Sequence, residues 1–211
     1  MIDLWNWFVK LTGWPPWRLV FRCRRHAPAG GKPWRVKGPV IICCNHTSVW
    51  DYADMLMVFF TRTLRCQMAE LLFREKGPVL RLFLRMMGGI QVDRGAHDYG
   101  FMDRSAQILA RGGAVLIFPE GRLPREGETS PLPYQPGAAY LALQTGVPVL
   151  PVYTDGRYFS GKRNHLAVGT PIDPAAFRTD GDDVREQVSR LNDAIRGRIL
   201  ELEGWVDANC R

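Results

Sequence analysis

The stretch that determines the fold is VIICCNHTSVWD, residues 40–51. Its five apolar residues, Val40 to Cys44, are typical of a buried strand in a sheet that helices cover. The polar residues that follow end the strand, and Ser48 and Asp51 suit the start of a helix. A buried strand that runs directly into a helix predicts an α/β domain.

Apolar runs and helical patterns alternate along the rest of the chain. Strands are expected over residues 40–44, 89–93, 114–118, 147–153 and 165–168, and helices over residues 51–61, 77–87, 99–111, 137–144 and 183–201. Two prolines, Pro148 and Pro151, favour an edge position for the strand that contains them. The chain has 211 residues, of which 46% are hydrophobic, so it can bury one sizeable core. We therefore predict a single α/β domain over residues 38–211, with a mixed, mostly parallel central sheet flanked by helices.

The first 44 residues account for the net charge of the chain, which is +7. They hold eight Lys and Arg against one acidic residue, Asp3, whereas the other residues hold 20 basic and 20 acidic side chains. Five of the seven tryptophans lie in the same segment, and indole rings favour sites with one apolar and one wet side. Basic residues set among Trp and aliphatic side chains favour a lipid surface over nucleic acid.

Residues 1–37 are expected to form two short helices at a membrane interface. Polar residues recur at helical spacing in the first helix and leave a wide apolar surface. The polar residues are Asp3, Asn6 and Lys10, and the apolar ones are Leu4, Trp5, Trp7, Phe8, Val9 and Leu11. The second helix is expected to begin at Pro16, after a joint at Gly13–Pro15. Its basic stripe consists of Arg18, Arg22 and Arg25.

These features predict peripheral membrane contact through residues 1–25. The alternative is a helical hairpin that packs on its own domain, with its arginines solvated. A membrane-spanning helix is disfavoured because polar residues and prolines interrupt each apolar window. A secretory signal is disfavoured because Asp3 stands where a basic region is expected.

The five cysteines are an odd number without a C-x-x-C pair. They predict neither a disulfide framework nor a cysteine zinc site, and they favour a reducing compartment. We expect a peripheral or monotopic protein on the cytoplasmic face of a membrane, with no cofactor and no metal.

His46 and Asp51 are candidate catalytic residues because they follow a buried strand, where sites form in α/β sheets. A five-residue offset places two side chains about 140° apart on one helix, so His46 must precede the helix for Asp51 to reach its ring. The carboxylate would then hold one ring nitrogen and leave the other as a base toward a hydroxyl. The alternative is that Ser48 and Asp51 form a capping box, with His46 as a bystander.

Three further motifs lie at predicted strands. Glu120, Gly121 and Arg122 follow one strand, and the glycine permits close backbone approach. Arg94 follows another strand, and its planar guanidinium suits a phosphate. The alternatives are an ordinary turn with a surface ion pair and a solvated arginine. The apolar run over residues 147–152 can line an acyl-sized pocket or belong to the core.

Together these four motifs resemble those of the glycerolipid acyltransferases, the family that includes the 1-acylglycerol-3-phosphate acyltransferases. The resemblance covers about residues 38–155, and the motifs occur in the family's order. It implies transfer of a fatty acyl group from a thioester of coenzyme A or acyl carrier protein to a hydroxyl of a lysophospholipid. The expected acceptor is 1-acylglycerol-3-phosphate, which gives phosphatidate.

The resemblance also implies roles for single residues. His46 matches the general base and Asp51 its orienting partner. The residues expected to bind the phosphate-bearing acceptor are Arg94, Glu120, Gly121 and Arg122, and we expect the charged ones to converge on one basic pocket near His46.

Two positions depart from the family's pattern. Arg122 follows Gly121 directly, and Leu123 stands where the family usually has arginine. Gln135 precedes Pro136 where a basic residue is common. These departures predict a rearranged phosphate site.

An acyl thioester is already activated, so the reaction requires a deprotonated hydroxyl close to the carbonyl. Backbone N–H groups near Ser48 are expected to stabilise the tetrahedral oxyanion. Ser48 lacks the G-x-S-x-G elbow of a nucleophile, so direct transfer is preferred. The alternatives are a thioesterase or lipase-like hydrolase, which would release fatty acid without an acceptor, and a non-enzymatic membrane-binding module.

Overall fold

The computed structural model describes residues 2–70, 77–92, 100–179, 181 and 183–210. The strands are β1 (Arg24–His26), β2 (Val40–Cys44), β3 (Leu64–Ala69), β4 (Ile90–Val92), β5 (Ala114–Ile117), β6 (Val149–Thr154) and β7 (His165–Val168). The helices are α1 (Ile2–Val20), α2 (Asp51–Val58), α4 (Pro78–Met86), α5 (Gly100–Ala110), α6 (Gly137–Thr145) and α7 (Val184–Cys210). Two short 3₁₀ segments lie at Pro33–Arg35 and Pro174–Phe177.

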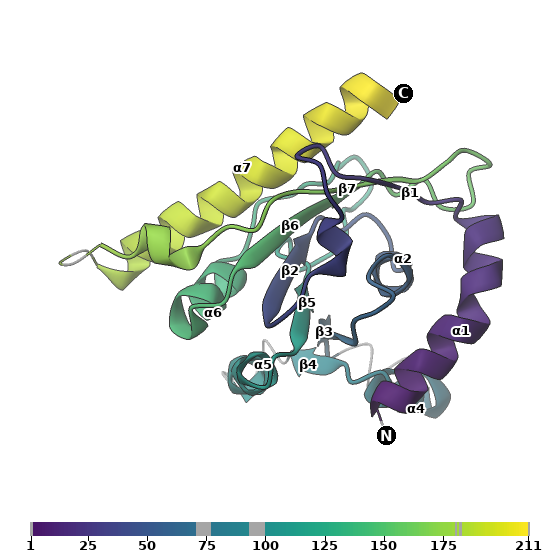
Figure 1. Cartoon of the computed structure of the whole chain (residues 1–211), viewed down its shortest axis with the longest axis horizontal. Helices are drawn as coiled ribbons and strands as arrows, with labels where there is room; N and C mark the ends of the chain where they lie inside the picture. Colours follow the sequence, from purple (N-terminus) through teal and green to yellow (C-terminus); the bar gives the residue numbers. More distant parts are fainter. Residues whose placement is uncertain (1, 71–76, 93–99, 180, 182, 211) are drawn as a thin grey trace.

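Within the described residues the strands form one seven-stranded sheet in the order β1-β7-β6-β2-β5-β3-β4. Neighbouring strands are parallel except β6 and β7, which are antiparallel. Helices cover both faces, with α5, α6 and α7 on one side and α1, α2 and α4 on the other (Figure 1). The predicted α/β fold with a mixed, mostly parallel sheet is confirmed.

The central strand β2 is buried along its whole length. Its side chains alternate between the two faces, as strand geometry requires. Ile41 and Cys43 pack with α5, α6 and α7, whereas Ile42 and Cys44 pack with α2 and α4. The continuous apolar run therefore reflects a strand that lies between two cores.

β6 lies between β2 and β7, so the edge position predicted from its prolines is wrong. The N–H and C=O of one strand residue point to the same side, and the carbonyl of Pro151 accepts a hydrogen bond from the N–H of Gly169 at 2.9 Å. β7 ends at Val168. The N–H that Pro151 lacks would therefore point past the end of β7, where it interrupts little of the ladder.

Two strands were not expected from the sequence. β1 follows α1 closely and pairs with β7, so part of the segment 1–37 lies in the sheet. β3 joins β4 to the rest of the sheet through β5. The last helix also differs from its prediction, because α7 continues beyond residue 201 to Cys210.

α1 is one helix from Ile2 to Val20, so the predicted joint at Gly13–Pro15 is wrong. Pro15 and Pro16 lie inside this helix. A proline in a helix interior removes a hydrogen bond and can bend the helix without ending it. α1 accordingly curves past α2 in Figure 1, and it contacts both α2 and α4.

The polar residues Asn6 and Lys10 of α1 are buried against the domain, whereas the apolar residues Leu4, Phe8 and Leu11 are exposed. Asn6 Nδ2 donates to the carbonyl of Met87 at 3.3 Å. Lys10 Nζ donates to carbonyls just beyond α2, those of Phe59 at 3.2 Å, Phe60 at 3.1 Å and Arg62. Helix ends leave carbonyls without intrahelical partners, and Lys10 supplies these donors from another helix.

Burial lowers the pKa of Lys10 to about 8, so the ammonium is still the main form at pH 7. Replacing Lys10 with methionine is expected to lower the free energy of unfolding by about 2–4 kcal/mol, because buried carbonyls lose their donor. Urea denaturation measures this loss. The exposed Lys37 provides a matched control, since its change to methionine should alter stability by less than about 0.5 kcal/mol. Equal effects of the two substitutions would contradict this role of Lys10.

The outer side of α1 is apolar. Its exposed side chains include Leu4 at 77%, Phe8 at 55% and Leu11 at 62%. Among the described helices, none combines the length and the apolar character that crossing a bilayer requires.

Candidate active site

The candidate site lies at the carboxyl ends of three neighbouring strands. β2 is parallel to both β5 and β6, so the three strands end at the same edge of the sheet. Asn45, directly after β2, binds the end of β6: its Nδ2 donates to Thr154 O at 3.0 Å and its Oδ1 accepts from Thr154 N at 2.8 Å. The backbone that leads to His46 is therefore fixed on the sheet.

His46 and Asp51 are in contact, with 2.8 Å between His46 Nδ1 and Asp51 Oδ2. Asp51 is the first residue of α2 and is fully buried, whereas the His46 side chain is 20% exposed. The ring of Phe118 stacks on the imidazole, with 4.2 Å between centroids and 16° between planes. Because His46 lies in the loop before α2, its ring reaches Asp51, which it could not do if both residues lay on one helix. Asp51 holds Nδ1, and Nε2 is the ring nitrogen that it leaves for other chemistry.

The Asp51 carboxylate accepts four more hydrogen bonds. Oδ2 accepts from the N–H groups of Thr47 at 2.7 Å and Ser48 at 2.9 Å, and Oδ1 accepts from the hydroxyls of Thr47 at 2.9 Å and Tyr158 at 2.8 Å. Asp51 therefore orders the loop and also holds the imidazole, and the catalytic role of the pair stays a prediction. Asp51 already engages the N–H of Ser48, so stabilisation of an oxyanion by other backbone N–H groups near Ser48 stays a prediction.

A buried polar network connects this carboxylate region to α1. Asn164 donates from Nδ2 to Asp54 Oδ2 at 2.8 Å, and Trp17 donates from Nε1 to Asp54 Oδ1 at 2.8 Å. Asn164 Oδ1 in turn accepts from the Thr154 hydroxyl at 3.2 Å, which lies 3.5 Å from the Tyr158 hydroxyl. Burial raises the pKa of Asp54 to about 7. The end of α1, helix α2 and the β6–β7 loop therefore meet beside the dyad.

Glu120 is buried, and both of its oxygens accept from this chain. Oε1 accepts from the N–H of His46 at 2.8 Å and the hydroxyl of Ser130 at 2.7 Å, and Oε2 accepts from the N–H of Leu132 at 2.9 Å. Gly121 has a φ of 73°, which favours glycine. Glu120 thus positions the His46 backbone, and its contact with an acceptor stays a prediction.

Arg122 forms a bidentate ion pair with Glu128, with 2.8 Å from Nη2 to Oε1 and 2.5 Å from Nη1 to Oε2. This partner lowers the pKa of Glu128 to about 2. Arg94 lies outside the described residues. The structure brings Glu120 to His46 and shows Arg122 paired in its own loop, and the convergence of these side chains with Arg94 stays a prediction.

Comparison with known proteins gives consistent results. Human 1-acyl-sn-glycerol-3-phosphate acyltransferase beta is 31% identical over 173 residues, which cover 78% of this chain and 61% of that protein. The human alpha form is 32% identical over 176 residues, covering 78% and 58%. This chain therefore spans less than two thirds of the length of these relatives.

The crystal structure of the 1-acyl-sn-glycerophosphate (LPA) acyltransferase PlsC from Thermotoga maritima has the same fold, with a TM-score of 0.64 and 22% identity over 90% of this chain and 74% of that one. The family model described as Acyltransferase matches residues 21–155, which include β2, the His46–Asp51 pair and Glu120. On this match the chain belongs to the acyltransferase family.

Proposed function

We propose that the protein transfers a fatty acyl group from an acyl-CoA or acyl-ACP thioester to the hydroxyl of a lysophospholipid. The proposed acceptor is 1-acylglycerol-3-phosphate, and the product is phosphatidate. The observation that carries this proposal is the 2.8 Å contact between His46 Nδ1 and Asp51 Oδ2 in a member of the acyltransferase family. The two human relatives support the acceptor, because both are named as 1-acyl-sn-glycerol-3-phosphate acyltransferases.

In this mechanism Asp51 accepts the Nδ1–H of His46 and so fixes the tautomer in which Nε2 carries a lone pair. Nε2 takes the proton of the acceptor hydroxyl while the oxygen attacks the thioester carbonyl. The tetrahedral intermediate then loses the thiolate, and the imidazolium returns the proton to sulfur. The C–O bond forms, the C–S bond breaks, and the free enzyme is regenerated without a covalent enzyme intermediate.

Tyr158 is a positioning residue in this scheme, because it acts on His46 through Asp51. Its change to phenylalanine removes one hydrogen bond of about 1 kcal/mol, so kcat is expected to fall by roughly fivefold with little change in the KM of the acceptor. The pH dependence of kcat is the second readout, because the Asp51 carboxylate that faces His46 loses the hydrogen bond that Tyr158 donates. An unchanged kcat and pH profile would show that the tyrosine serves packing alone.

Acceptor phosphate is proposed to bind Arg94 and Arg122 near the turn at Gly121. The Arg122–Glu128 pair is solvent-exposed, and exposed ion pairs are weak. A phosphate group can therefore replace Glu128 as the partner of the guanidinium. Arg122→Ala is expected to raise the acceptor KM more than it lowers kcat.

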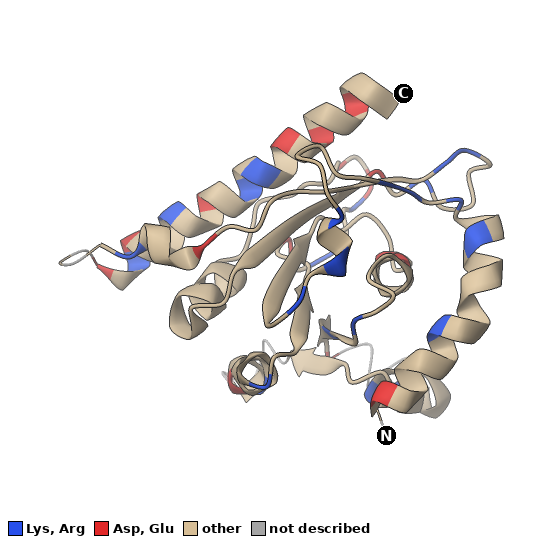
Figure 2. Cartoon of the chain, in the orientation of Figure 1, with Lys and Arg blue, Asp and Glu red and all other residues tan. Residues whose placement is uncertain are grey.

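Membrane contact is proposed through residues 1–25, supported by the apolar outer side of α1. Phe21, just after α1, joins this surface to the loop that follows His46. The ring of Phe21 lies 5.9 Å from that of Trp50 and 5.4 Å from that of Phe159, and Trp50 and Phe159 are 5.2 Å apart and exposed. Lys and Arg gather near the end of α1 and in the β6–β7 loop (Figure 2), where they suit anionic lipid.

The proposed location is the cytoplasmic face of a membrane, with peripheral or monotopic attachment. The described cysteines are all free thiols, which suits a reducing compartment. The apolar surface beside His46 would receive a lysophospholipid from the bilayer.

An acceptor panel tests the proposal. Purified protein is incubated with lysophosphatidate, glycerol 3-phosphate or lysophosphatidylcholine, each with acyl-CoA and with acyl-ACP, and the lipid products are identified. Phosphatidate from lysophosphatidate is the expected main product. Preferred acylation of glycerol 3-phosphate, or fatty acid release at the same rate without an acceptor, would contradict the assignment.

A further inference from the structure

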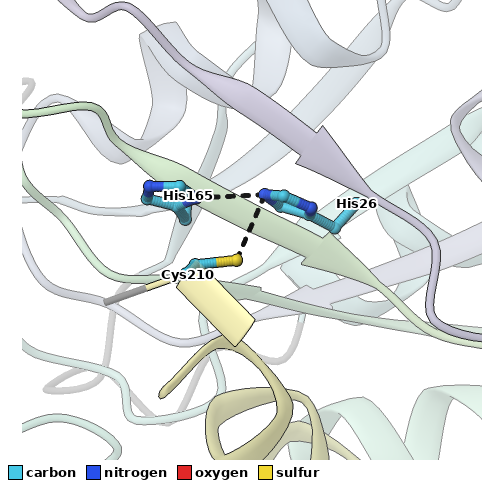
Figure 3. A group of neighbouring side chains, drawn as sticks. All are labelled: His26, His165 and Cys210. Atoms are coloured by element: carbon cyan, nitrogen blue, oxygen red, sulfur yellow. Dashed lines mark hydrogen bonds between the residues drawn. The ribbon is translucent and has the colours of Figure 1, made fainter. Parts of the chain in front are cut away.

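Two histidines and a cysteine meet on the sheet face that α7 covers. His26 ends β1, His165 begins β7, and Cys210 ends α7. Figure 3 shows the three side chains pointing toward one another. Among the described residues they form the one group of three His, Cys or acidic side chains whose ligand atoms all lie within 4.8 Å of one another.

The distances suit a small tetrahedral metal ion. His26 Nε2 lies 3.0 Å from His165 Nδ1 and 3.6 Å from Cys210 Sγ. Zinc bonds of about 2.0–2.1 Å to nitrogen and 2.3 Å to sulfur place tetrahedral ligand atoms about 3.3–3.7 Å apart. The two distances from His26 Nε2 are within a few tenths of an ångström of these values, and His165 Nδ1 and Cys210 Sγ lie within 4.8 Å of each other. Imidazole nitrogen with thiolate sulfur is also the ligand set that zinc prefers.

The surroundings favour the ligand forms of the histidines. Burial lowers the pKa of both His26 and His165, which favours the neutral rings that metal ligation requires. One of the two hydrogen-bonded nitrogens carries a ring proton, so metal binding requires that ring to take its other tautomer. Burial raises the pKa of the Cys210 thiol, while the nearby Arg24 acts in the opposite direction. A bound dication would displace that thiol proton to the buffer. Asp155 lies beside the cluster: its Oδ1 accepts the N–H of His165 at 3.0 Å, and its Oδ2 pairs with Arg157 Nε at 3.3 Å.

The cluster is also rigidly supported. The rings of His26 and His165 stack at 5.3 Å with 17° between planes, and the ring of Trp205 lies 5.3 Å from that of His26. The two histidines lie on paired strands, where His26 pairs with Ala167, the residue two positions along β7 from His165. Both side chains are thus held in place before any ligand arrives, which lowers the ordering cost of binding.

We propose that His26, His165 and Cys210 bind one Zn²⁺ ion, with a water molecule as the fourth ligand. The ion ties the short edge strand β1 and strand β7 to the last turn of α7. Sequence spacing did not indicate this site, because His26 lies 139 residues from His165 and 184 from Cys210. The site is separated from the dyad by the sheet: along β7, Leu166 and Val168 face the α2 side, whereas His165 lies with Ala167 on the α7 side.

The test uses the untagged full chain after treatment with a chelator, with Co²⁺ and Zn²⁺ as probes. One Co²⁺ per chain is expected, with the visible bands of a tetrahedral site and a thiolate-to-cobalt charge-transfer band in the near ultraviolet. Zn²⁺ should displace it and, at 100 times its Kd, raise Tm by about 5–10 °C. Cys210→Ser should abolish the charge-transfer band and weaken Zn²⁺ binding by at least about 100-fold, since even supporting residues of metal sites contribute 10–100-fold. His26→Gln should weaken Zn²⁺ binding to a similar extent.

Cys23→Ser and His46→Ala are the matched controls, because each removes a thiol or an imidazole outside the cluster. Both should bind Zn²⁺ like the wild type. The proposal is overturned if the wild type binds no stoichiometric metal, if the cobalt spectrum lacks the thiolate band, or if Cys210→Ser keeps the wild-type affinity. These readouts do not depend on acyl transfer, so they stand apart from the proposed enzymatic function.

Discussion

Acyl transfer is expected to fall by about 10² to 10⁴-fold in kcat when His46 is replaced by alanine, because the acceptor hydroxyl loses its base. The fold should survive. Among the residues that the structure describes, the His46 side chain hydrogen-bonds only to Asp51, and it stacks on Phe118, so the loss of stability should be about 1–2 kcal/mol. Thermal unfolding and steady-state kinetics on the same preparation separate the two effects.

Ser48→Ala is the matched control for this prediction. The Ser48 hydroxyl accepts one long hydrogen bond, from Trp50 N at 3.3 Å, and direct transfer gives it no chemical step. This variant should keep kcat within about tenfold of the wild type. Loss of activity in Ser48→Ala together with acylation of the wild-type protein would indicate a serine nucleophile instead.

Substitutions of Asp51 test whether its carboxylate orients His46. An asparagine oxygen at the Oδ2 position can still accept from Thr47 N, Ser48 N and His46 Nδ1, while its amide faces the hydroxyls of Thr47 and Tyr158, which can accept as well as donate. Asp51→Asn should therefore fold and lose less activity than His46→Ala. Asp51→Ala leaves several buried donors without an acceptor and should also lower Tm.

The second large effect is expected for binding to anionic vesicles. The triple substitution Leu4→Glu, Phe8→Glu and Leu11→Glu should weaken this binding by at least about 100-fold. Full burial of one such side chain contributes about 1.5–3 kcal/mol, and the added carboxylates are repelled by anionic lipid. All three side chains are exposed, and glutamate is a good helix former, so α1 should stay folded on the domain.

Point substitutions are preferable to removal of residues 1–25, because α1 supplies the buried Lys10 and the Trp17 contact with Asp54. The matched control replaces three exposed residues of α7 with glutamate, namely Val184, Ser189 and Ala208. This variant carries the same charge change on another helix and should keep most of the vesicle binding. Added salt should weaken wild-type binding without abolishing it, since screening acts on the arginines and spares apolar insertion. Equal flotation of the two triple variants would place the membrane contact elsewhere.

Much of the fold could be predicted from local patterns. β2 and β7 have the predicted bounds, and most helices lie within a few residues of theirs. The main error was the predicted edge position of β6. A proline is disfavoured in a strand only where its missing N–H would have formed a hydrogen bond to the neighbouring strand. The sequence does not show that Pro151 faces Gly169, one residue beyond the end of β7.

Part of the candidate site could likewise be predicted from local patterns, and part could not. The contact of His46 with Asp51 followed from a short offset after a strand. The partners of that pair come from distant segments: Tyr158 lies 107 residues from Asp51, and Glu120 lies 74 residues from His46. The contact between Asp54 and Asn164 was also not predicted. The signal available in the sequence was Asp54 itself, an acidic residue in the predicted apolar helix that begins at Asp51.

The amphipathic pattern of α1 does not by itself show which side of the helix faces the domain. Asn6 and Lys10 mark a polar stripe, which would ordinarily face water. Here the stripe faces backbone carbonyls near the ends of α2 and α4, so the domain supplies the polar partners and the apolar side is exposed. Only the tertiary structure shows that these acceptors are present.

The most direct test of the account measures thiol release from the acyl donor with and without lysophosphatidate, for the wild type and for His46→Ala of verified fold. We predict that release by the wild type depends on lysophosphatidate, matches phosphatidate formation mole for mole, and falls by at least about 100-fold in the variant. Release at the wild-type rate without lysophosphatidate, or by His46→Ala, would contradict the proposal that His46 activates the acceptor hydroxyl for direct attack on the thioester.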